Sequence, residues 1–311
     1  MIFALTVFCT ALFIDGATDS ANSVAGAVAS GALTLRQANV LCALTSFLGC
    51  LIFCLFFPSV AESIASFVTF PEGLSFEYIA ASLISVALWS GIAWIFSLPT
   101  SEGNGLVAAG AGAALALGGS FDFMHLLWLI LSIIPAAALS AFAAVLFTKL
   151  FSKKPSVSLK APIILSSVLS AFFHGSQDGQ KFLALALSAS VITKSNLFLT
   201  VFLAAFFMGA GSMFGGRIIK KMGGEMAKAD TVSALSSDIG SAIVLALFTV
   251  IGLPVSTTHI KMTSLTAATR AVKRKTDKGT FVLLCAAWLA TFPVCFVLSF
   301  FITKLIFAIK L

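Results

Sequence analysis

Long apolar runs without any charged residue restrict what this chain can fold into more than any other feature. Six such runs cover residues 37–61, 78–101, 126–148, 195–216, 239–258 and 279–303. Each is at least as long as the ~20 residues that a helix needs to cross the hydrocarbon core of a bilayer. Because a chain inside lipid must satisfy its own backbone hydrogen bonds, these runs are predicted to be membrane-spanning helices.

The charge composition agrees with a membrane protein. Only 10% of the 311 residues are charged, whereas a soluble domain carries about a quarter, so the composition excludes a water-soluble protein of this size. The formal net charge of +7 is expected to come from basic cytoplasmic loops. We therefore predict membrane lipid, and not nucleic acid, as the partner of the basic residues.

Neither the N-terminus nor the cysteines change this interpretation. No Lys or Arg precedes Arg36, so the first apolar segment lacks the basic region of a cleaved signal peptide and is predicted to be a span. The six cysteines lie in apolar segments without the spacing of a metal site. They are predicted to be small packing residues.

The apolar runs and the shorter apolar segments between them predict about ten transmembrane helices. Their approximate centres are Phe13, Cys50, Leu88, Ala111, Ala137, Phe173, Ala204, Leu245, Leu265 and Ala290. Several of these segments are short or interrupted by Gly and polar residues, so we expect two or more broken helices. The predicted fold is an all-α integral membrane protein.

The basic residues predict the orientation. They cluster after the first span, at the centre of the chain, and after the seventh and ninth spans. These are Arg36; Lys149, Lys153, Lys154 and Lys160; Arg217, Lys220, Lys221 and Lys228; and Arg270, Lys273, Arg274, Lys275 and Lys278. Ten spans with both termini extracytoplasmic would place every basic loop in the cytoplasm, so we predict a multi-pass protein of the cell membrane with that orientation.

The sequence also repeats itself. Gly16-Ala17-Thr18-Asp19 is similar to Gly175-Ser176-Gln177-Asp178, and Leu98-Pro99-Thr100-Ser101 is similar to Leu253-Pro254-Val255-Ser256. With five spans in each half, the second copy must enter the membrane from the opposite side, as in the inverted repeats of many secondary transporters. We predict a first repeat over residues 1–150, a cytoplasmic connecting loop over 151–160 and an inverted second repeat over 161–311, with broken helices at the midplane.

Each copy of the repeat places one carboxylate in apolar surroundings. A charge at membrane depth is costly unless it is paired or hydrated, so Asp19 and Asp178 are predicted to be functional. Polar neighbours surround both: Thr18, Ser20, Asn22 and Ser23 in the first copy, and His174, Ser176, Gln177, Gln180 and Lys181 in the second. We expect Gly16, Gly175 and Gly179 to let the helices unwind there, since freed carbonyls and carboxylates suit a small cation.

The second motif supplies hydroxyl groups at a helix break. Pro254 interrupts a helix, and the sequence Ser256-Thr257-Thr258-His259 follows it. Hydroxyls and backbone N–H groups at a new helix start suit an oxyanion. In the first half the matching stretch is Ser101-Glu102-Gly103-Asn104.

At these residues the chain resembles the PiT inorganic phosphate transporters of the Pho4 superfamily, over nearly its whole length. The most specific segments are Gly252–His259 (GLPVSTTH), His174–Lys181 (HGSQDGQK) and Asp15–Ser23 (DGATDSANS), and Trp89, Trp94 and Leu98–Ser101 resemble the first-half partner. Asp238 stands where the family tends to carry Glu. The resemblance implies symport of inorganic phosphate with Na⁺ or H⁺, through a midplane site formed by both halves.

The chain departs from the family pattern within this site. The Asn of the signature is Thr18 in one copy and Gln177 in the other, and Glu102, Gly103 and Asn104 replace the first-half hydroxyls and His. The coupling ion and the oxyanion therefore stay open, and transport of sulfate is an alternative. We expect Glu102 to be a coupling group, because a carboxylate beside phosphate must be protonated, paired or neutralised by a cation; otherwise it would be a solvated residue at the cytoplasmic mouth.

The polar residues divide into two sets of predicted ligands. The coupling cation is assigned to Asp19, Asp178 and Glu102. The predicted phosphate ligands are Thr18, Asn22, Ser23, Ser101, Gln177, Gln180, Lys181, Ser256, Thr257 and Thr258. Asp238, His259 and Asn104 are further candidates at the site. His259 and His174 would either contact the substrate or ion or hold a helix end in place. No cofactor beyond the coupling ion is predicted.

Two other classes of function are alternatives. A membrane-embedded hydrolase would pair Ser256 or Ser176 with His259 or His174, and a passive channel would use the intramembrane carboxylates. The repeat and its broken helices favour a carrier that works by alternating access, so we predict a transporter and not an enzyme. A homodimer is a further assembly that the sequence allows.

Overall fold

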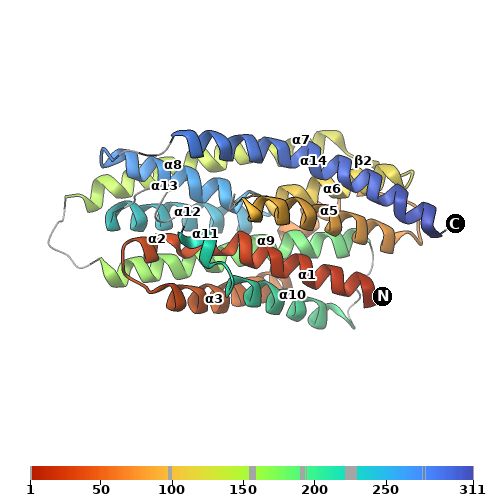
Figure 1. Cartoon of the computed structure of the whole chain (residues 1–311), viewed down its shortest axis with the longest axis horizontal. Coiled ribbons are helices and arrows are strands. Elements are labelled where there is room, and N and C mark those ends of the chain that lie inside the picture. Colours follow the sequence, from red (N-terminus) through yellow and green to blue (C-terminus); the bar gives the residue numbers. More distant parts are fainter. Residues whose placement is uncertain are drawn as a thin grey trace.

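The computed structural model describes residues 2–96, 100–153, 159–189, 193, 195–220, 230–274, 276 and 278–310, and these are almost entirely helical (Figure 1). The first half consists of α1 (Ile2–Thr18), the 3₁₀ helix η1 (Ser20–Val24), α2 (Ala25–Ala29), α3 (Leu35–Phe56), α4 (Ser59–Ala65), β1 (Val68–Thr69), α5 (Ser75–Ile95), α6 (Glu102–Ala116), β2 (Ser120–Phe121), α7 (Phe123–Leu131) and α8 (Ile133–Phe151). The second half consists of α9 (Lys160–Ser188), α10 (Leu197–Ser212), α11 (Gly216–Lys220), α12 (Thr231–Ile251), α13 (Thr257–Ala271) and α14 (Lys278–Lys310). The two short strands pair antiparallel, and the predicted helical class is confirmed.

Five segments of the described chain are helical, apolar and long enough to span a membrane. They are Leu35–Phe56, Ser75–Ala93, Phe123–Phe151, Thr231–Ile251 and Phe281–Ile309. Their outer surfaces carry exposed apolar side chains such as Leu88, Phe142, Val250 and Leu289. Such exposure is unfavourable in water, at about 25 cal/mol per Å², whereas lipid tails are as apolar as these side chains. The chain is therefore a membrane protein, as predicted.

The helices α6 and α13 are each too short to cross a bilayer. α6 and α13 have 15 residues each, which corresponds to about 22 Å against ~30 Å of hydrocarbon. Each follows a non-helical segment, with Ser101 or Ser256 in an extended conformation at the N-cap. The ten predicted span centres all lie in helices, including Ala111 in α6 and Leu265 in α13. The count of ten spans itself stays a prediction.

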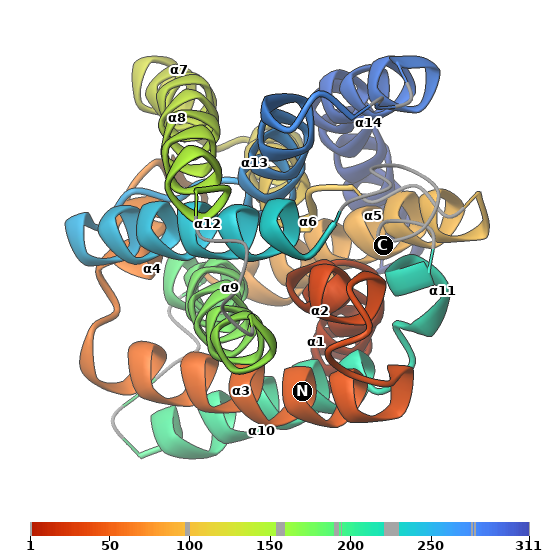
Figure 2. The ribbon, with the colours of Figure 1, turned by 90° about the vertical axis from the view of Figure 1, so that its left-hand side faces the viewer.

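Helix packing in the first half corresponds to helix packing in the second. α6 packs against α5 and α14, and α13 packs in the same way against α12 and α8. α5 also contacts α1 and α14, while α12 contacts α9 and α8. Figure 2 shows α9 between α12 and α3. Two related halves would produce such matched contacts, and the boundaries 1–150, 151–160 and 161–311 stay a prediction.

The two short helices extend in opposite directions from the middle of the molecule. α6 runs toward the end at which both termini lie, and α13 runs toward the other end (Figure 1). The connection from α2 to α3, the end of α8 and the start of α9 also lie at that other end. Arg36, Lys153 and Lys160 belong to these connections in the sequence. The predicted orientation requires the connections with these basic residues to lie together at one end of the molecule, and they do. Which side of the membrane this end faces stays a prediction.

The helix α9 stays intact through the whole 174–181 segment, so the predicted unwinding at Gly175 and Gly179 is wrong. α9 is continuous over 29 residues. A Cβ atom on Gly175 would meet the backbone of Ser46 in α3, and one on Gly179 would meet the side chain of Cys50. These glycines therefore let two helix backbones approach closely, and they do not break the helix.

The helix α1, in contrast, ends at the first signature. Its last residue is Thr18, and Asp19 takes the N-cap position of η1. The Asp19 N–H still donates to the Asp15 carbonyl at 2.8 Å. A Cβ atom on Gly16 would meet the backbone of Met208 in α10, so this glycine too serves a close helix crossing. Of the two predicted breaks at the aspartate signatures, the structure contains the first.

Candidate functional site

The starts of α6 and α13 meet in the middle of the molecule. The Thr258 hydroxyl oxygen lies 3.0 Å from the Thr100 carbonyl oxygen, so the first turn of α13 contacts the segment before α6. Ser101 and Ser256, at the two N-caps, are 1% and 0% exposed. The unpaired N–H groups and positive dipole ends of two helices therefore face one buried region, where they favour negative charge.

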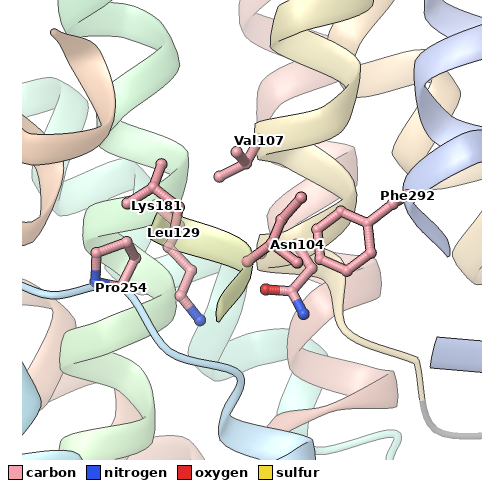
Figure 3. Close-up of a pocket in the computed structure, with 8 residues that line it drawn as sticks. Asn104, Val107, Leu129, Lys181, Pro254 and Phe292 are labelled. Atoms are coloured by element: carbon pink, nitrogen blue, oxygen red, sulfur yellow. The ribbon is translucent and has the colours of Figure 1, made fainter. Parts of the chain in front are cut away.

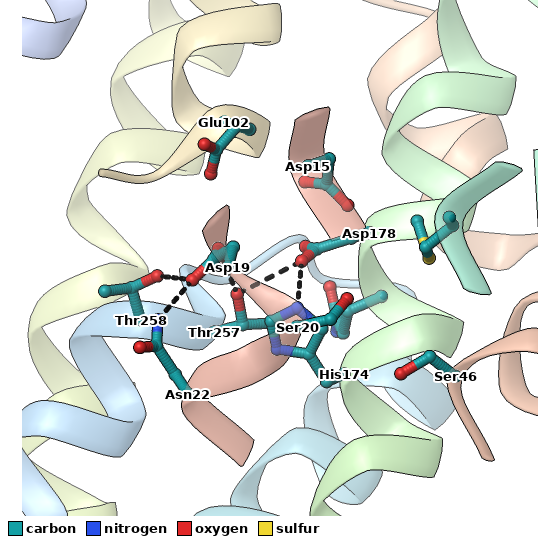
Figure 4. A network of polar contacts seen from close by, with 12 residues as sticks. Asp15, Asp19, Ser20, Asn22, Ser46, Glu102, His174, Asp178, Thr257 and Thr258 are labelled. Carbon is teal, nitrogen blue, oxygen red and sulfur yellow. Dashed lines mark hydrogen bonds and ion pairs between the residues drawn. The ribbon is translucent and has the colours of Figure 1, made fainter. Parts of the chain in front are cut away.

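Asp19 lies at this junction and accepts hydrogen bonds from α13 and η1. The hydroxyls of Thr257 and Thr258 both donate to its carboxylate, the first at 3.1 Å, and the Asn22 amide donates at 2.9 Å. The Thr257 hydroxyl also lies 3.3 Å from the Asp178 carboxylate, so it stands between the two signature aspartates (Figure 4). The structure thus gathers residues from both halves of the chain into one buried network.

Asp178 has two nitrogen partners, a lysine and a histidine, on its own helix. The Lys181 Nζ atom lies 2.7 Å and the His174 Nε2 atom 2.9 Å from its carboxylate oxygens, and all three side chains are buried. Lys181 also donates to the Val255 carbonyl at 2.6 Å, in the break between α12 and α13. A charged lysine therefore neutralises Asp178, as a buried carboxylate requires, and also ties α9 to this break.

Glu102 is the first residue of α6 and has only 2% of its surface exposed. Thr18 donates to its Oε1 atom at 2.8 Å and Thr100 donates to the same atom at 3.2 Å. The Oε2 atom has no hydrogen-bond partner among the described residues. The alternative in which Glu102 is a solvated residue at the cytoplasmic mouth is therefore wrong, and one oxygen of a buried carboxylate is available to a ligand.

Asp15 is missing from the ligands predicted above. It is 0% exposed, and neither carboxylate oxygen has a partner in the part of the chain that the structure describes. It lies in the last turn of α1, four residues before Asp19. The sequence held a signal for it: a second carboxylate four residues away, in the same apolar span, is as unusual as the first.

Two groups of buried side chains are close enough to hold a metal ion. In one, ligand atoms of Asp19, His174 and Asp178 all lie within 4.8 Å of one another, and in the other those of Asp15, Asp19 and Glu102 do. Figure 4 shows Asp15 and Glu102 on the side of Asp19 opposite His174. Carboxylate oxygens are the ligands that hard cations prefer, so the second group, made only of carboxylates, suits such an ion.

The two glutamines predicted as phosphate ligands have other partners. Gln177 lies beside the α12–α13 break, where its amide donates to the Leu253 carbonyl at 3.2 Å and accepts from the Val255 N–H at 3.4 Å. Gln180 accepts from the Val60 N–H at 2.9 Å, at the start of α4. Gln177 therefore holds the break in place, and Gln180 lies outside the junction of α6 and α13.

His259 and Ser256 close the first turn of α13. The Ser256 hydroxyl accepts the His259 N–H at 3.3 Å and contacts the Nδ1 atom of the same residue. The imidazole packs against Trp288, with ring centroids 3.9 Å apart. The Ser–His contact that a hydrolase would need is thus present as part of a helix cap, in which the side chain satisfies the helix start.

Asp238 belongs to a separate buried cluster. It forms an ion pair with Lys261 and accepts hydrogen bonds from Ser167 at 2.5 Å and Ser166 at 3.5 Å. These partners join α12 to α13 and α9. The cluster around Asp238 is therefore a link between helices beside the network of Asp19.

Ser23, a predicted phosphate ligand, is buried in η1.

A small pocket opens beside the junction (Figure 3). Its lining residues are Gly103, Asn104, Val107, Leu129, Ile130, Lys181, Pro254 and Phe292. Asn104 is 9% exposed, and its Nδ2 atom has no partner among the residues that the structure covers. Asn104 and Lys181 therefore give a mostly apolar pocket two polar side chains.

Leu98 and Pro99, which precede α6, lie outside the described residues.

Comparison with known proteins identifies related chains. A model described as the phosphate transporter family matches residues 15–157 and again residues 151–299. The chain is 30% identical, over 97% of both sequences, to a probable low-affinity inorganic phosphate transporter of Bacillus subtilis (strain 168). It is 26% identical to a protein of the same description from Rhizobium meliloti (strain 1021), over 92% of this chain and 90% of that one.

One solved structure has a closely similar fold. It is described as the sodium-dependent phosphate transporter, and it superimposes with a TM-score of 0.89 over 99% of both chains. The two sequences are 19% identical. At this identity the likeness shows a common fold, and the site rests on the contacts of this chain.

Proposed function

Because the chain belongs to the phosphate transporter family, we propose that it carries inorganic phosphate across the cell membrane together with a cation. The related proteins are described as inorganic phosphate transporters, and the related structure as sodium-dependent. These descriptions support phosphate as the substrate and Na⁺ as the coupling cation, with H⁺ as the second candidate. The chain is then a secondary transporter and not an enzyme.

The position of the Thr257 hydroxyl carries this proposal. It lies 3.1 Å from the Asp19 carboxylate and 3.3 Å from that of Asp178. A hydroxyl has one hydrogen to donate. A phosphate oxygen at the start of α13 would compete with the two carboxylates for that hydrogen. A carboxylate that no longer received this hydrogen bond would be stabilised by a cation. Binding of the anion and of the cation is thus linked through one side chain.

The phosphate would lie at the start of α13, where three kinds of donor converge. The backbone N–H groups of the first turn are unpaired within the helix. The hydroxyls of Thr257 and Thr258 point into the same buried network. Lys181 supplies the positive charge, 2.7 Å from Asp178. A charged donor and several neutral donors in a buried region form strong hydrogen bonds to an oxyanion.

Alternating access would require the site to open toward either side. The short helices α6 and α13 both begin at the site, come from different halves of the chain and extend toward opposite ends of the molecule (Figure 1). We propose that each forms part of one gate. The cation and phosphate would couple their movements if each binds the outward and inward states with different affinity.

Uptake of labelled phosphate into proteoliposomes tests this function. An inward Na⁺ gradient, a K⁺ gradient of the same size and a pH gradient are compared at zero membrane potential. We expect accumulation above the external concentration with the Na⁺ gradient, and no reduction of it by excess sulfate. Uptake that only equilibrates, whatever the gradient, would show a passive channel. Accumulation with the pH gradient alone would assign H⁺, and competition by sulfate would assign a broader oxyanion substrate.

A further inference from the structure

We infer that the cation binds to Asp15, Asp19 and Glu102, in a site separate from the pair formed by Asp178 and Lys181. This assignment rests on the proposed function, because it locates the cation that phosphate transport would use. It differs from the assignment predicted from the sequence, which is Asp19, Asp178 and Glu102, in that Asp15 takes the place of Asp178. It also gives a role to Asp15, which the repeat leaves unassigned.

The charge on Asp178 is already compensated. Lys181 lies 2.7 Å from one of its oxygens, and His174 lies 2.9 Å from the other. A cation placed beside Asp178 would therefore also lie beside the Lys181 ammonium group. Two positive charges beside the same carboxylate would repel each other strongly in a buried region. Asp178 is thus the less suitable ligand.

Asp15 and Glu102 have the opposite character. None of the ion pairs formed by the described residues includes either of them. Both are buried, yet both oxygens of Asp15 and the Oε2 atom of Glu102 have no hydrogen-bond partner within the described ranges. Taking a charged carboxylate out of water without a partner costs several kcal/mol. A bound cation would remove this penalty.

The three carboxylates converge from separate segments. Asp15 projects from the last turns of α1, Asp19 from the break after it, and Glu102 from the first turn of α6. One oxygen of each lies within 4.8 Å of the others, which is a separation that one ion of oxygen-ligand type can bridge. A cation there would hold α6 against α1. The same ion would adjoin the hydroxyls of Thr257 and Thr258 through Asp19.

Cation-dependent thermal stability of the detergent-purified protein tests the location without requiring transport. NaCl is titrated against choline chloride at constant ionic strength, without phosphate, and MgCl₂ is titrated separately. A cation at concentration c that binds the folded state stabilises it by RT ln(1 + c/Kd), and the half-saturating concentration is the Kd fitted to this dependence of the unfolding temperature. The variants are Asp15→Asn and Glu102→Gln, with the paired replacement Asp178→Asn/Lys181→Gln, which removes one charge of each sign. Glu62→Gln, an exposed carboxylate of α4, is the control for loss of a charge.

We expect the half-saturating Na⁺ concentration to rise at least tenfold in Asp15→Asn and in Glu102→Gln, and to stay within threefold in the paired replacement and in Glu62→Gln. The same pattern with Mg²⁺ instead of Na⁺ would keep the site and assign a divalent ion. Loss of the effect in the paired replacement alone, or no cation effect on the wild type, would overturn the inference. If phosphate is not carried while this pattern holds, the proposed function fails and the cation site stands.

Discussion

Thr18 forms a hydrogen bond of 2.8 Å to Glu102 and shares its one hydroxyl hydrogen with a carbonyl of its own helix, four residues earlier, at 2.7 Å. The first residue ends α1 and the second begins α6, so the bond joins helices that are far apart in the sequence. These are also two of the positions at which the chain departs from the pattern of its family, which has Asn in the signature and a hydroxyl residue in the short helix. The two departures are partners, so a change at one should alter the other.

Replacing Thr18 by Val removes the hydroxyl and keeps the volume of the side chain. A lost hydrogen bond to a charged group costs about 1.5–3 kcal/mol, which corresponds to a factor of ten or more in affinity. We expect the half-saturating Na⁺ concentration for phosphate uptake to rise by about that factor. Thr10 is the matched control, because it lies on the exposed side of the same helix and donates to the Thr6 carbonyl. An equal loss in Thr10→Val would show a general effect on α1.

Replacing Thr257 by Val is expected to weaken phosphate binding more than cation binding. Its hydroxyl would otherwise donate to the oxyanion, and each such bond contributes about 1.5–3 kcal/mol. The half-saturating phosphate concentration should rise about tenfold or more in uptake assays. Thr269→Val is the control, since Thr269 is buried in the same helix and donates to the Leu265 carbonyl. An altered Na⁺ dependence with an unchanged phosphate dependence would mean that Thr257 serves the cation.

The helices and the polar motifs could be predicted because they depend on local sequence. Apolar runs must be helical in lipid, and the break before Ser256 follows from Pro254. The behaviour of the two aspartate signatures could not be predicted from their similarity. α1 ends at Thr18, just before Asp19, whereas α9 continues past Asp178, and its Gly175 is packed against α3. That contact lies between segments more than 100 positions apart, which no local pattern records.

Side-chain partners were the least predictable feature of the site. Gln180 lies two residues after Asp178, yet its amide oxygen accepts from the start of α4. Asp15 precedes the other signature, yet its carboxylate converges with Glu102 from a different helix. Sequence spacing indicates which residues share a helix face. It does not indicate which face of another helix lies opposite, and that contact decides the role of each polar group.

Asp178 and Lys181 form a buried ion pair, so each charged side chain is stabilised by the presence of the other. Removal of one member of a buried pair leaves an uncompensated charge and costs about 3–5 kcal/mol, whereas replacement of both costs less. We expect Asp178→Asn and Lys181→Gln each to lower the unfolding temperature and to abolish coupled uptake. The double variant should recover most of the unfolding temperature while uptake stays absent. Additive losses of stability in the double variant would contradict a direct interaction between the two side chains.

The crossing of α9 over α3 makes Gly179 sensitive to a single added methyl group. A Cβ atom at this position would meet the Cys50 side chain, and the two helices would have to move apart. Overpacking of this kind costs about 1–3 kcal/mol, although Ala is the better helix former by up to ~1 kcal/mol. Gly91→Ala is the matched control, because a Cβ atom on Gly91, in α5, meets no atom of the described chain within 4 Å. We therefore expect Gly179→Ala to lower the unfolding temperature and uptake, and Gly91→Ala to leave uptake unchanged and the unfolding temperature equal or higher. If Gly179→Ala matches the wild type in both measurements, the helices do not cross as closely as the structure places them.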